Sequence, residues 1–286
     1  MRAKKRQESE ENFLMNPKIE EISELKETAV KAALEAGKLA KRLLAKDTKI
    51  SFKGEIDLVT EVDLRSEKQI IEEISKKFPD HEFLSEESGA KKTGSKYLWI
   101  IDPLDGTTNY AHGFPIFAIS IALAFENNVL LGVVYDPNFN ELFLAEKGKG
   151  ATLNGKRIFV SKTSHLSKAL LATGFPYYIH ENPKKIFEYF ESFYLKTQGV
   201  RRLGAATLDL TYIACGRIDG FWEAGLKPWD TAAAGLVVSE AGGTLSRFNG
   251  APFDDYLPEI VASNGILHQE MLFTIREVNA ENEAIS

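Results

Sequence analysis

The strongest constraint on the fold comes from residues 98–109, where an apolar run ends in a tight turn that contains two acids. The run predicts a buried strand, and Pro103 restricts Asp102 before it to an extended backbone. Asp105 follows three residues after Asp102, and Gly106 permits a sharp turn where a side chain would interfere. The two threonines that come next predict the first turn of a short helix.

This construction predicts a site for a hard divalent cation that carries a phosphate. Asp102 and Asp105 would lie on one side of the turn, with the carbonyl of Leu104 between them as a further oxygen ligand. The backbone N–H groups of Gly106 and Thr107 would lie at a helix N-terminus, where phosphate binds readily. The same residues also suit an Asx-turn followed by a capped helix, so the segment alone does not decide between the two.

Three further acid-bearing segments favour the metal site. Each acid has a simpler explanation when taken singly: solvated surface charge for the loop of Glu86, and helix capping for Asp63 and Asp230. Each nevertheless falls at the end of an expected strand or the start of an expected helix. These are the places where side chains converge in α/β architectures.

The composition excludes several kinds of protein but does not identify the function. With 286 residues, 44% of them hydrophobic, the chain can form one large core or two joined halves that share a cleft. Its formal net charge of -6 argues against non-specific nucleic-acid binding. The single cysteine, Cys215, rules out an internal disulfide and is expected to be a small packed side chain. No histidine spacing predicts a zinc site.

Periodicity separates the chain into two halves. Apolar residues at three- and four-residue spacing predict a long helix from about residue 17 to 43, then a second with Ile70, Ile74 and Phe78 inside. Turn sequences separate several apolar runs, which predicts an antiparallel meander. Beyond this meander strand and helix signals alternate. The expected strands are 83–84, 97–101, 117–125, 129–135, 141–145, 170–173 and 221–223, and the later helices are 183–196, 205–214 and 231–241.

These elements predict an α+β protein built as a layered α-β-α-β-α sandwich. An antiparallel-sheet half with the metal and phosphate site occupies residues 17–160, and an α/β half that supplies Asp230 and substrate contacts occupies residues 161–286. No low-complexity linker separates the halves, so we expect one shared core. Residues 4–12 carry no apolar side chain, and residues 1–16 are expected to form a disordered tail.

Four motifs, spread over nearly all of the chain beyond its first dozen residues, resemble the inositol monophosphatase family within the lithium-sensitive, magnesium-dependent phosphatases. The residues after Gly106, with Asn109 and the run 112–115, are similar to those of inositol monophosphatases rather than of related phosphatase branches. The matching motifs are DLVTEVD (57–63), SEESG (85–89), WIIDPLDGTTNYAHGFP (99–115) and KPWDTAAAGLVVSEAGG (227–243).

The resemblance implies two to three Mg²⁺ ions. Glu86, Asp102 and the carbonyl of Leu104 would bind one ion. Asp102, Asp105 and Asp230 would bind a second, and a third, weaker ion would rely on Glu86. Metal-activated water would then attack the phosphate, so no Ser, Cys or His nucleophile is needed.

The resemblance also implies roles around the substrate. Thr107, with Asp63 behind it, would orient the attacking water, so that Asp63, Glu86 and Thr107 form the catalytic set. The N–H groups of Gly106 and Thr107 would hold the phosphate. The hydroxyls of a small phosphorylated polyol or sugar would meet Asp105, the backbone of Ala206, and Glu223.

Two other functions compete with inositol monophosphate hydrolysis. A fructose-1,6-bisphosphatase, or a dual enzyme, would need cations for a second phosphate, and Arg201, Arg202 and Arg217 are the candidates. Surface charge or a structural ion pair is the preferred interpretation of these arginines. A non-catalytic interaction protein that kept the fold would be expected to lack a metal ligand, and every motif acid is present.

The remaining expectations concern the setting of the protein. No apolar run reaches membrane-spanning length, and the N-terminus does not have the features of a signal peptide. We therefore expect a cytoplasmic protein with neither a membrane nor a nucleic-acid partner. The family resemblance adds inhibition by lithium and a homodimer, although the sequence does not identify the dimer interface.

Overall fold

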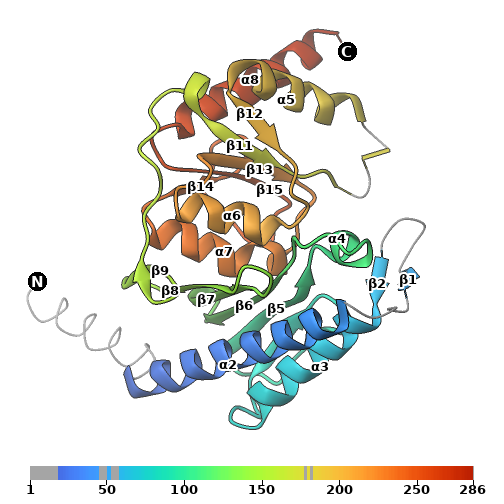
Figure 1. The fold of residues 1–286 in the computed structure, drawn as a ribbon. Helices are drawn as coiled ribbons and strands as arrows, with labels where there is room; N and C mark the ends of the chain where they lie inside the picture. Colours follow the sequence, from blue (N-terminus) through green and yellow to red (C-terminus); the bar gives the residue numbers. More distant parts are fainter. Residues whose placement is uncertain (1–18, 45–49, 53–57, 177–178, 181–182, 286) are drawn as a thin grey trace, which may run out of the picture.

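The chain forms five stacked layers in the order helix, sheet, helix, sheet, helix (Figure 1). This is the layered α+β sandwich that the sequence predicts. The tail expected at residues 1–16 lies outside the described part of the chain. The computed structural model describes residues 19–44, 50–52, 58–176, 179–180 and 183–285.

The helices agree closely with the periodicity of the sequence. The expected helix 183–196 is found at those residues, whereas the final helix of the chain was not predicted. The helices are α2 (Ile19–Leu44), α3 (Glu61–Ser75), α4 (Thr107–Ala111), α5 (Pro183–Lys196), α6 (Ala206–Ala214), α7 (Pro228–Glu240) and α8 (His268–Ile285), with a short 3-10 turn η1 (Leu166–Lys168).

The first half contains an eight-stranded sheet that includes the predicted antiparallel meander. Only one of its pairings, β3 with β5, is parallel. A two-stranded ribbon, β1 (Ile50–Phe52) with β2 (Leu58–Thr60), lies outside this sheet. In spatial order the sheet consists of β10 (Lys156–Arg157), β9 (Gly150–Leu153), β8 (Glu141–Glu146), β7 (Asn128–Asp136), β6 (Ala118–Phe125), β5 (Tyr97–Asp105), β3 (Glu82–Ser85) and β4 (Gly89–Lys91).

The second half contains a five-stranded mixed sheet. The pairings of β11 with β12 and β13 are parallel, as in an α/β unit, whereas β15 runs antiparallel to both of its neighbours. The strands beyond residue 240 were not predicted, because they are short and lack clear alternation. In spatial order the sheet consists of β12 (Gly199–Arg201), β11 (Leu170–Thr173), β13 (Gly220–Ala224), β15 (Glu259–Ser263) and β14 (Thr244–Ser246).

Helix α7 is the central element of the sandwich. It is apolar on all sides because one face packs on the large sheet and the other lies under the second sheet. Its approach to the large sheet is so close that a Cβ on Gly132 of β7 would overlap the carbonyl of Ala233. Hydrogen bonds tie both of its ends to the large sheet: Ser120 donates to the Trp229 carbonyl, and Glu240 accepts from the Gly150 amide.

Two acids lie slightly deeper in their helices than the sequence indicated. Asp230 was expected to be an N-cap, but α7 begins at Pro228, and Asp230 is its third residue. The Asp230 carboxylate accepts a hydrogen bond from the Lys227 amide, which is half of a capping box. Asp63 is likewise the third residue of α3 and is fully buried.

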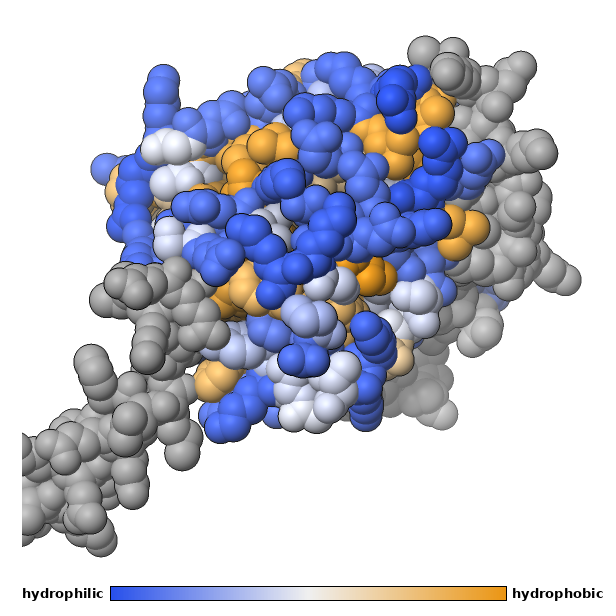
Figure 2. All heavy atoms as spheres, turned by 90° about the horizontal axis from the view of Figure 1, so that it is seen from below, coloured by the Kyte–Doolittle hydropathy of each residue, from blue (hydrophilic) through white to orange (hydrophobic). Residues whose placement is uncertain are grey.

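The outer layer formed by α2 and α3 gives the molecule a largely polar face. Seen from below, hydrophilic residues cover most of this face, with smaller hydrophobic areas between them (Figure 2). Ion pairs such as Lys31–Glu73 join the two helices. Within the part of the chain that the structure describes, none of the helices combines the length and apolar character needed to cross a bilayer.

We expect Gly132→Ala to destabilise the protein by about 1–3 kcal/mol, because the added methyl group must displace α7. Unfolding in denaturant measures the loss. Gly199→Ala is the matched control, since a Cβ there would come within 3.4 Å of the flexible end of Arg201 alone. Equal stability of the two variants would contradict the tight contact between β7 and α7.

Candidate active site

A pocket of about 520 Å³ lies where the two halves meet, between the end of β5 and the N-termini of α6 and α7. It brings together almost all of the site residues predicted from the sequence. Asp63 is the exception, and it lies behind Thr107. The predicted residues that line the pocket are Glu86, Asp102, Leu104, Asp105, Gly106, Thr107, Ala206, Glu223 and Asp230.

A β-bulge explains how Asp102 and Asp105 share this pocket. Residues three apart in a regular strand point to opposite faces of the sheet. Here Asp102 pairs with Ser120 and Asp105 with Ala118, so β5 contains one more residue than β6 between these two pairs. The extra residue restores the alternation, and both carboxylates face the same side. The sequence prediction ended this strand at residue 101, but it continues through the bulge to Asp105.

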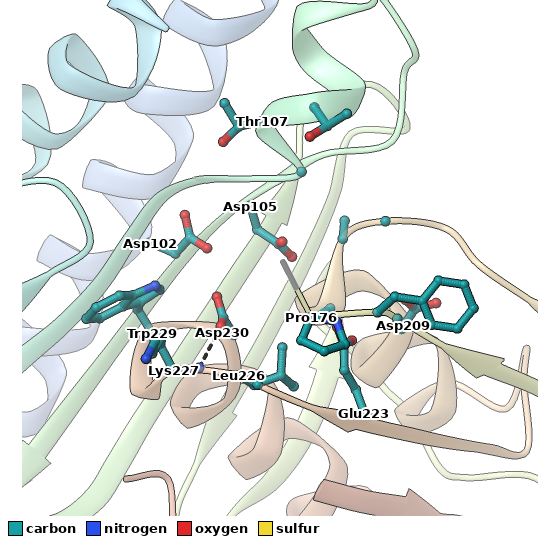
Figure 3. Close-up of a pocket in the computed structure, with 18 of the residues that line it drawn as sticks. Asp102, Asp105, Thr107, Pro176, Asp209, Glu223, Leu226, Lys227, Trp229 and Asp230 are labelled. Atoms are coloured by element: carbon teal, nitrogen blue, oxygen red, sulfur yellow. Dashed lines mark hydrogen bonds between the residues drawn. The ribbon is translucent and has the colours of Figure 1, made fainter. Parts of the chain in front are cut away.

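A backbone N–H group holds each of the three aspartates. Asp102 accepts from the Leu104 amide at 2.9 Å. Asp105 accepts from the Thr207 amide at 2.8 Å, and Asp230 accepts from the Lys227 amide at 2.7 Å. These bonds fix the carboxylates in the orientation seen in Figure 3, where all three face a common space with Thr107 beside it.

The buried carboxylates of this space repel one another. Burial raises the pKa of Asp102 well above its usual range, and the charges of Glu86, Asp105 and Asp230 raise it further. Burial and the charge of Asp105 likewise raise the pKa of Asp230. Burial also raises the pKa of Asp105, while hydrogen bonds from Thr207 oppose the rise. A bound cation would relieve this repulsion.

The donor set suits Mg²⁺. Carboxylate and carbonyl oxygens are the ligands that this hard cation prefers, and the pocket offers Glu86, Asp102, Asp105, Asp230 and the Leu104 carbonyl. Among the described residues, no three Asp, Glu, His or Cys side chains are already arranged to hold a metal ion.

Thr107 connects this cluster to a buried acid behind it. Its hydroxyl lies 2.9 Å from a carboxylate oxygen of Asp63 and 3.1 Å from the carbonyl oxygen of Leu104. A hydroxyl has one hydrogen to donate, so donation to Asp63 leaves the oxygen lone pairs of Thr107 available to a molecule in the pocket. This arrangement can accept a hydrogen bond from a water molecule and orient it.

Gly106 shapes the turn that precedes α4. Its φ of 94° lies in the left-handed region, and a Cβ would come within 2.8 Å of the Ile116 carbonyl oxygen. Only glycine fits there. The first N–H groups of a helix have no partner within the helix, and those after Gly106 lie beside the pocket.

Glu67 is a site residue that the sequence reasoning missed. Its carboxylate accepts hydrogen bonds from the Ser85 hydroxyl and, at 3.0 Å, from the Glu87 amide. It therefore holds the chain on both sides of Glu86. Its position four residues after Asp63, on the same face of α3, was a signal that could have identified it.

Asn109 and Gly174 are two further residues whose roles depend on the tertiary fold. The Asn109 amide donates to the carbonyls of Ile116 and Leu203, both at 2.8 Å, and so joins the two halves beside the pocket. A Cβ at Gly174 would overlap the Glu223 carboxyl group, so glycine makes room for that acid. No local pattern in the sequence marks either role.

The arginines weighed for a second phosphate fall into different environments. Arg217 forms a bidentate ion pair with Glu141 at 2.5 Å, in agreement with the preferred structural interpretation. Arg202 instead lines the pocket, where its charge lowers the pKa of Glu223 against the larger effect of burial. Cys215 is half-buried, and burial raises the pKa of its thiol, as expected for a packed side chain.

Comparison with known proteins agrees with this geometry. The model of the inositol monophosphatase family matches residues 21–280. An inositol-1-monophosphatase of Synechocystis is 46% identical over 250 residues, which cover 86% of each chain. The Nus factor SuhB of Pseudomonas aeruginosa is 44% identical over 257 residues, or 87% of this chain and 94% of the relative.

The solved structures include an inositol monophosphatase from Anabaena (Nostoc) with a TM-score of 0.82 and 41% identity, over 90% of this chain and 96% of that one. The fold and these relatives therefore support a phosphatase function. The chain belongs to the inositol monophosphatase family.

The buried acids predict an unusual pH dependence for the metal-free protein. Burial raises the pKa of Glu223 to about 8, against an ordinary 4.5, and the aspartates shift in the same direction. At pH values between 4.5 and about 8, the folded state therefore binds more protons than the unfolded state. The free energy of unfolding should therefore fall as pH rises from about 5 to 8.

Denaturant unfolding in a chelator, repeated across this pH range, measures the slope. Glu223→Gln should make the slope shallower because it removes one of the shifted acids. Stability that is constant or that increases with pH would contradict the rise in pKa that burial gives these carboxyl groups.

Proposed function

We propose that the chain is a Mg²⁺-dependent phosphomonoesterase that hydrolyses inositol monophosphate or a related polyol or sugar phosphate. The observation that carries the proposal is the meeting of buried acids from both halves beside a glycine-started helix and a Thr–Asp pair. The family membership supports phosphatase activity, and the 46% identity to an inositol-1-monophosphatase supports the substrate.

Glu86, Asp102, Asp105, Asp230 and the Leu104 carbonyl would hold two to three Mg²⁺ ions. When bound, the ions would supply Lewis acidity that activates water and neutralises charge on the departing oxygen. The chain's own contribution to binding is geometric. The bulge in β5 and the backbone bonds to the aspartates hold the acids in orientation without the ions.

The remaining residues act on the water and the ester. Thr107 donates its hydrogen to Asp63, accepts a hydrogen bond from the attacking water, and so directs it toward phosphorus. The N–H groups of Gly106 and Thr107 hold the phosphate oxygens. On the far side, Glu223 and the backbone of Ala206 meet the hydroxyls of the leaving group, with Asp105 between the two ends.

The charge of the far wall favours one phosphate over two. A second phosphate there would bring nearly two negative charges to a wall that holds two acids, Glu223 and Asp209, as well as Arg202. A neutral polyol can instead form hydrogen bonds with these acids, whether they are charged or protonated. Fructose-1,6-bisphosphate hydrolysis is therefore the weaker alternative.

A non-catalytic interaction role is the second candidate. It is favoured by the 44% identity to a relative named as a Nus factor. Against it, every predicted acid is present and lies in or against one pocket. The two roles differ in whether the purified protein releases phosphate.

Phosphate release from inositol-1-phosphate should require Mg²⁺ and be inhibited by Li⁺. Asp105→Asn should lower kcat by more than about a hundredfold, because it removes a metal ligand. It should also leave the melting temperature in chelator unchanged or higher, because Asn can still accept the bond from Thr207. If the wild type is inactive on a broad panel of phosphomonoesters with Mg²⁺, the proposal of enzymatic activity is wrong. If it cleaves fructose-1,6-bisphosphate faster than inositol-1-phosphate, the proposed substrate is wrong.

Glu223→Ala should raise KM for cyclitol phosphates far more than for a simple aryl phosphate, which has no hydroxyls to bind. Steady-state kinetics on both substrates provide the comparison. Equal losses on the two would show that Glu223 supports the fold rather than the substrate.

A further inference from the structure

Asp209 is a buried acid with no part in the proposed binding of metal ions or phosphate. It is the fourth residue of α6, a helix otherwise made of apolar side chains and threonines. It is 1% exposed, and its Oδ1 has no hydrogen-bond partner among the residues that the structure describes. It nevertheless lines the pocket, as does Glu223.

An internal role does not explain this acid. The residue that caps α6 is Ala205, and Asp209 lies too far along the helix to replace it. A buried polar atom without a partner costs stability, and native proteins rarely keep one without a reason. An apolar side chain would suit the surrounding core better.

The neighbours of Asp209 indicate what it faces. The charged groups that act on it are Glu223, Asp105 and Arg202. Glu223 on β13 lines the same wall, next to Gly174. The wall therefore presents two carboxyl groups from two different elements, with Arg202 nearby, to whatever occupies this end of the pocket.

We propose that Asp209 is a second hydroxyl-binding residue, which takes one hydroxyl of the leaving group while Glu223 takes another. The ligand class is a phosphate ester of a polyhydroxylated ring or chain. The inference rests on the proposed phosphatase function and deepens it. Two carboxyl groups select a leaving group with at least two correctly placed hydroxyls and discriminate against alkyl and aryl esters.

Asp209→Leu and Asp209→Asn test this role by kinetics and stability together. For Asp209→Leu, the loss in kcat/KM on inositol-1-phosphate should exceed the loss on p-nitrophenyl phosphate by roughly tenfold to hundredfold. Asp209→Asn keeps an acceptor and should lose less. Without substrate and metal, the melting temperature of Asp209→Leu should be unchanged or higher, which a structural role would not produce.

Asp136→Asn is the matched control. Asp136 is also buried, and one of its carboxylate oxygens also has no partner among the described residues, but it is the last residue of β7 and does not line the pocket. Its remaining bonds accept from the amides of Asn138 and Phe139, which Asn can preserve. This variant should keep the wild-type ratio between the two substrates.

Deoxy analogues identify the hydroxyl. With inositol phosphates that each lack one hydroxyl, the wild type should lose activity on the analogue whose missing group faces Asp209. On that analogue, Asp209→Leu should be as active as the wild type, because the hydroxyl that Asp209 would bind is already missing. The two enzymes and two substrates together form a double-mutant cycle between the residue and the hydroxyl.

The outcomes separate this inference from the function on which it rests. Equal losses on inositol-1-phosphate and p-nitrophenyl phosphate, or no analogue that couples to Asp209, would overturn the inference and leave the phosphatase intact. A wild type that cleaves p-nitrophenyl phosphate but no polyol phosphate would overturn both the substrate class and the role of Asp209.

Discussion

The close packing of α7 on the eight-stranded sheet is the contact on which the rest of the molecule depends. Gly132 and the alanines of α7 let the helix lie almost against the backbone of β7. The helix then has enough apolar surface left to support the second sheet. The same contact places Asp230, at the start of α7, opposite Asp102 and Asp105 at the end of β5. Architecture and site are thus consequences of one interface.

That interface concentrates negative charge where water is scarce. Hydrogen bonds from backbone N–H groups orient these acids and only partly offset the cost of burying their charge. Asp209 and Glu223 add to this acidic lining. Grouping buried acids in this way costs the fold stability, and the proposed binding of cations and hydroxyl groups would offset that cost.

Much of the fold was predictable because its signals are local. Helical periodicity and turn sequences predicted α2, α3 and the meander, and Gly106 predicted the turn before α4. The bulge in β5 was not predictable, because it exists only relative to the register of β6. The roles of Asp209, Asn109 and Gly174 depend on segments far away in the chain. The acids were found through their motifs, whereas the residues that position them required the tertiary structure.

The position of α7 late in the chain has a consequence for biosynthesis. The ribosome synthesises the N-terminal half first. All strands of the large sheet therefore emerge before α7, the helix that covers one face of that sheet. Until residue 240 has emerged, that apolar face requires protection from aggregation. Asp230 arrives in the same segment that closes the core. The nascent protein therefore completes its cluster of acids in the step that buries the sheet, and a truncated chain would have neither.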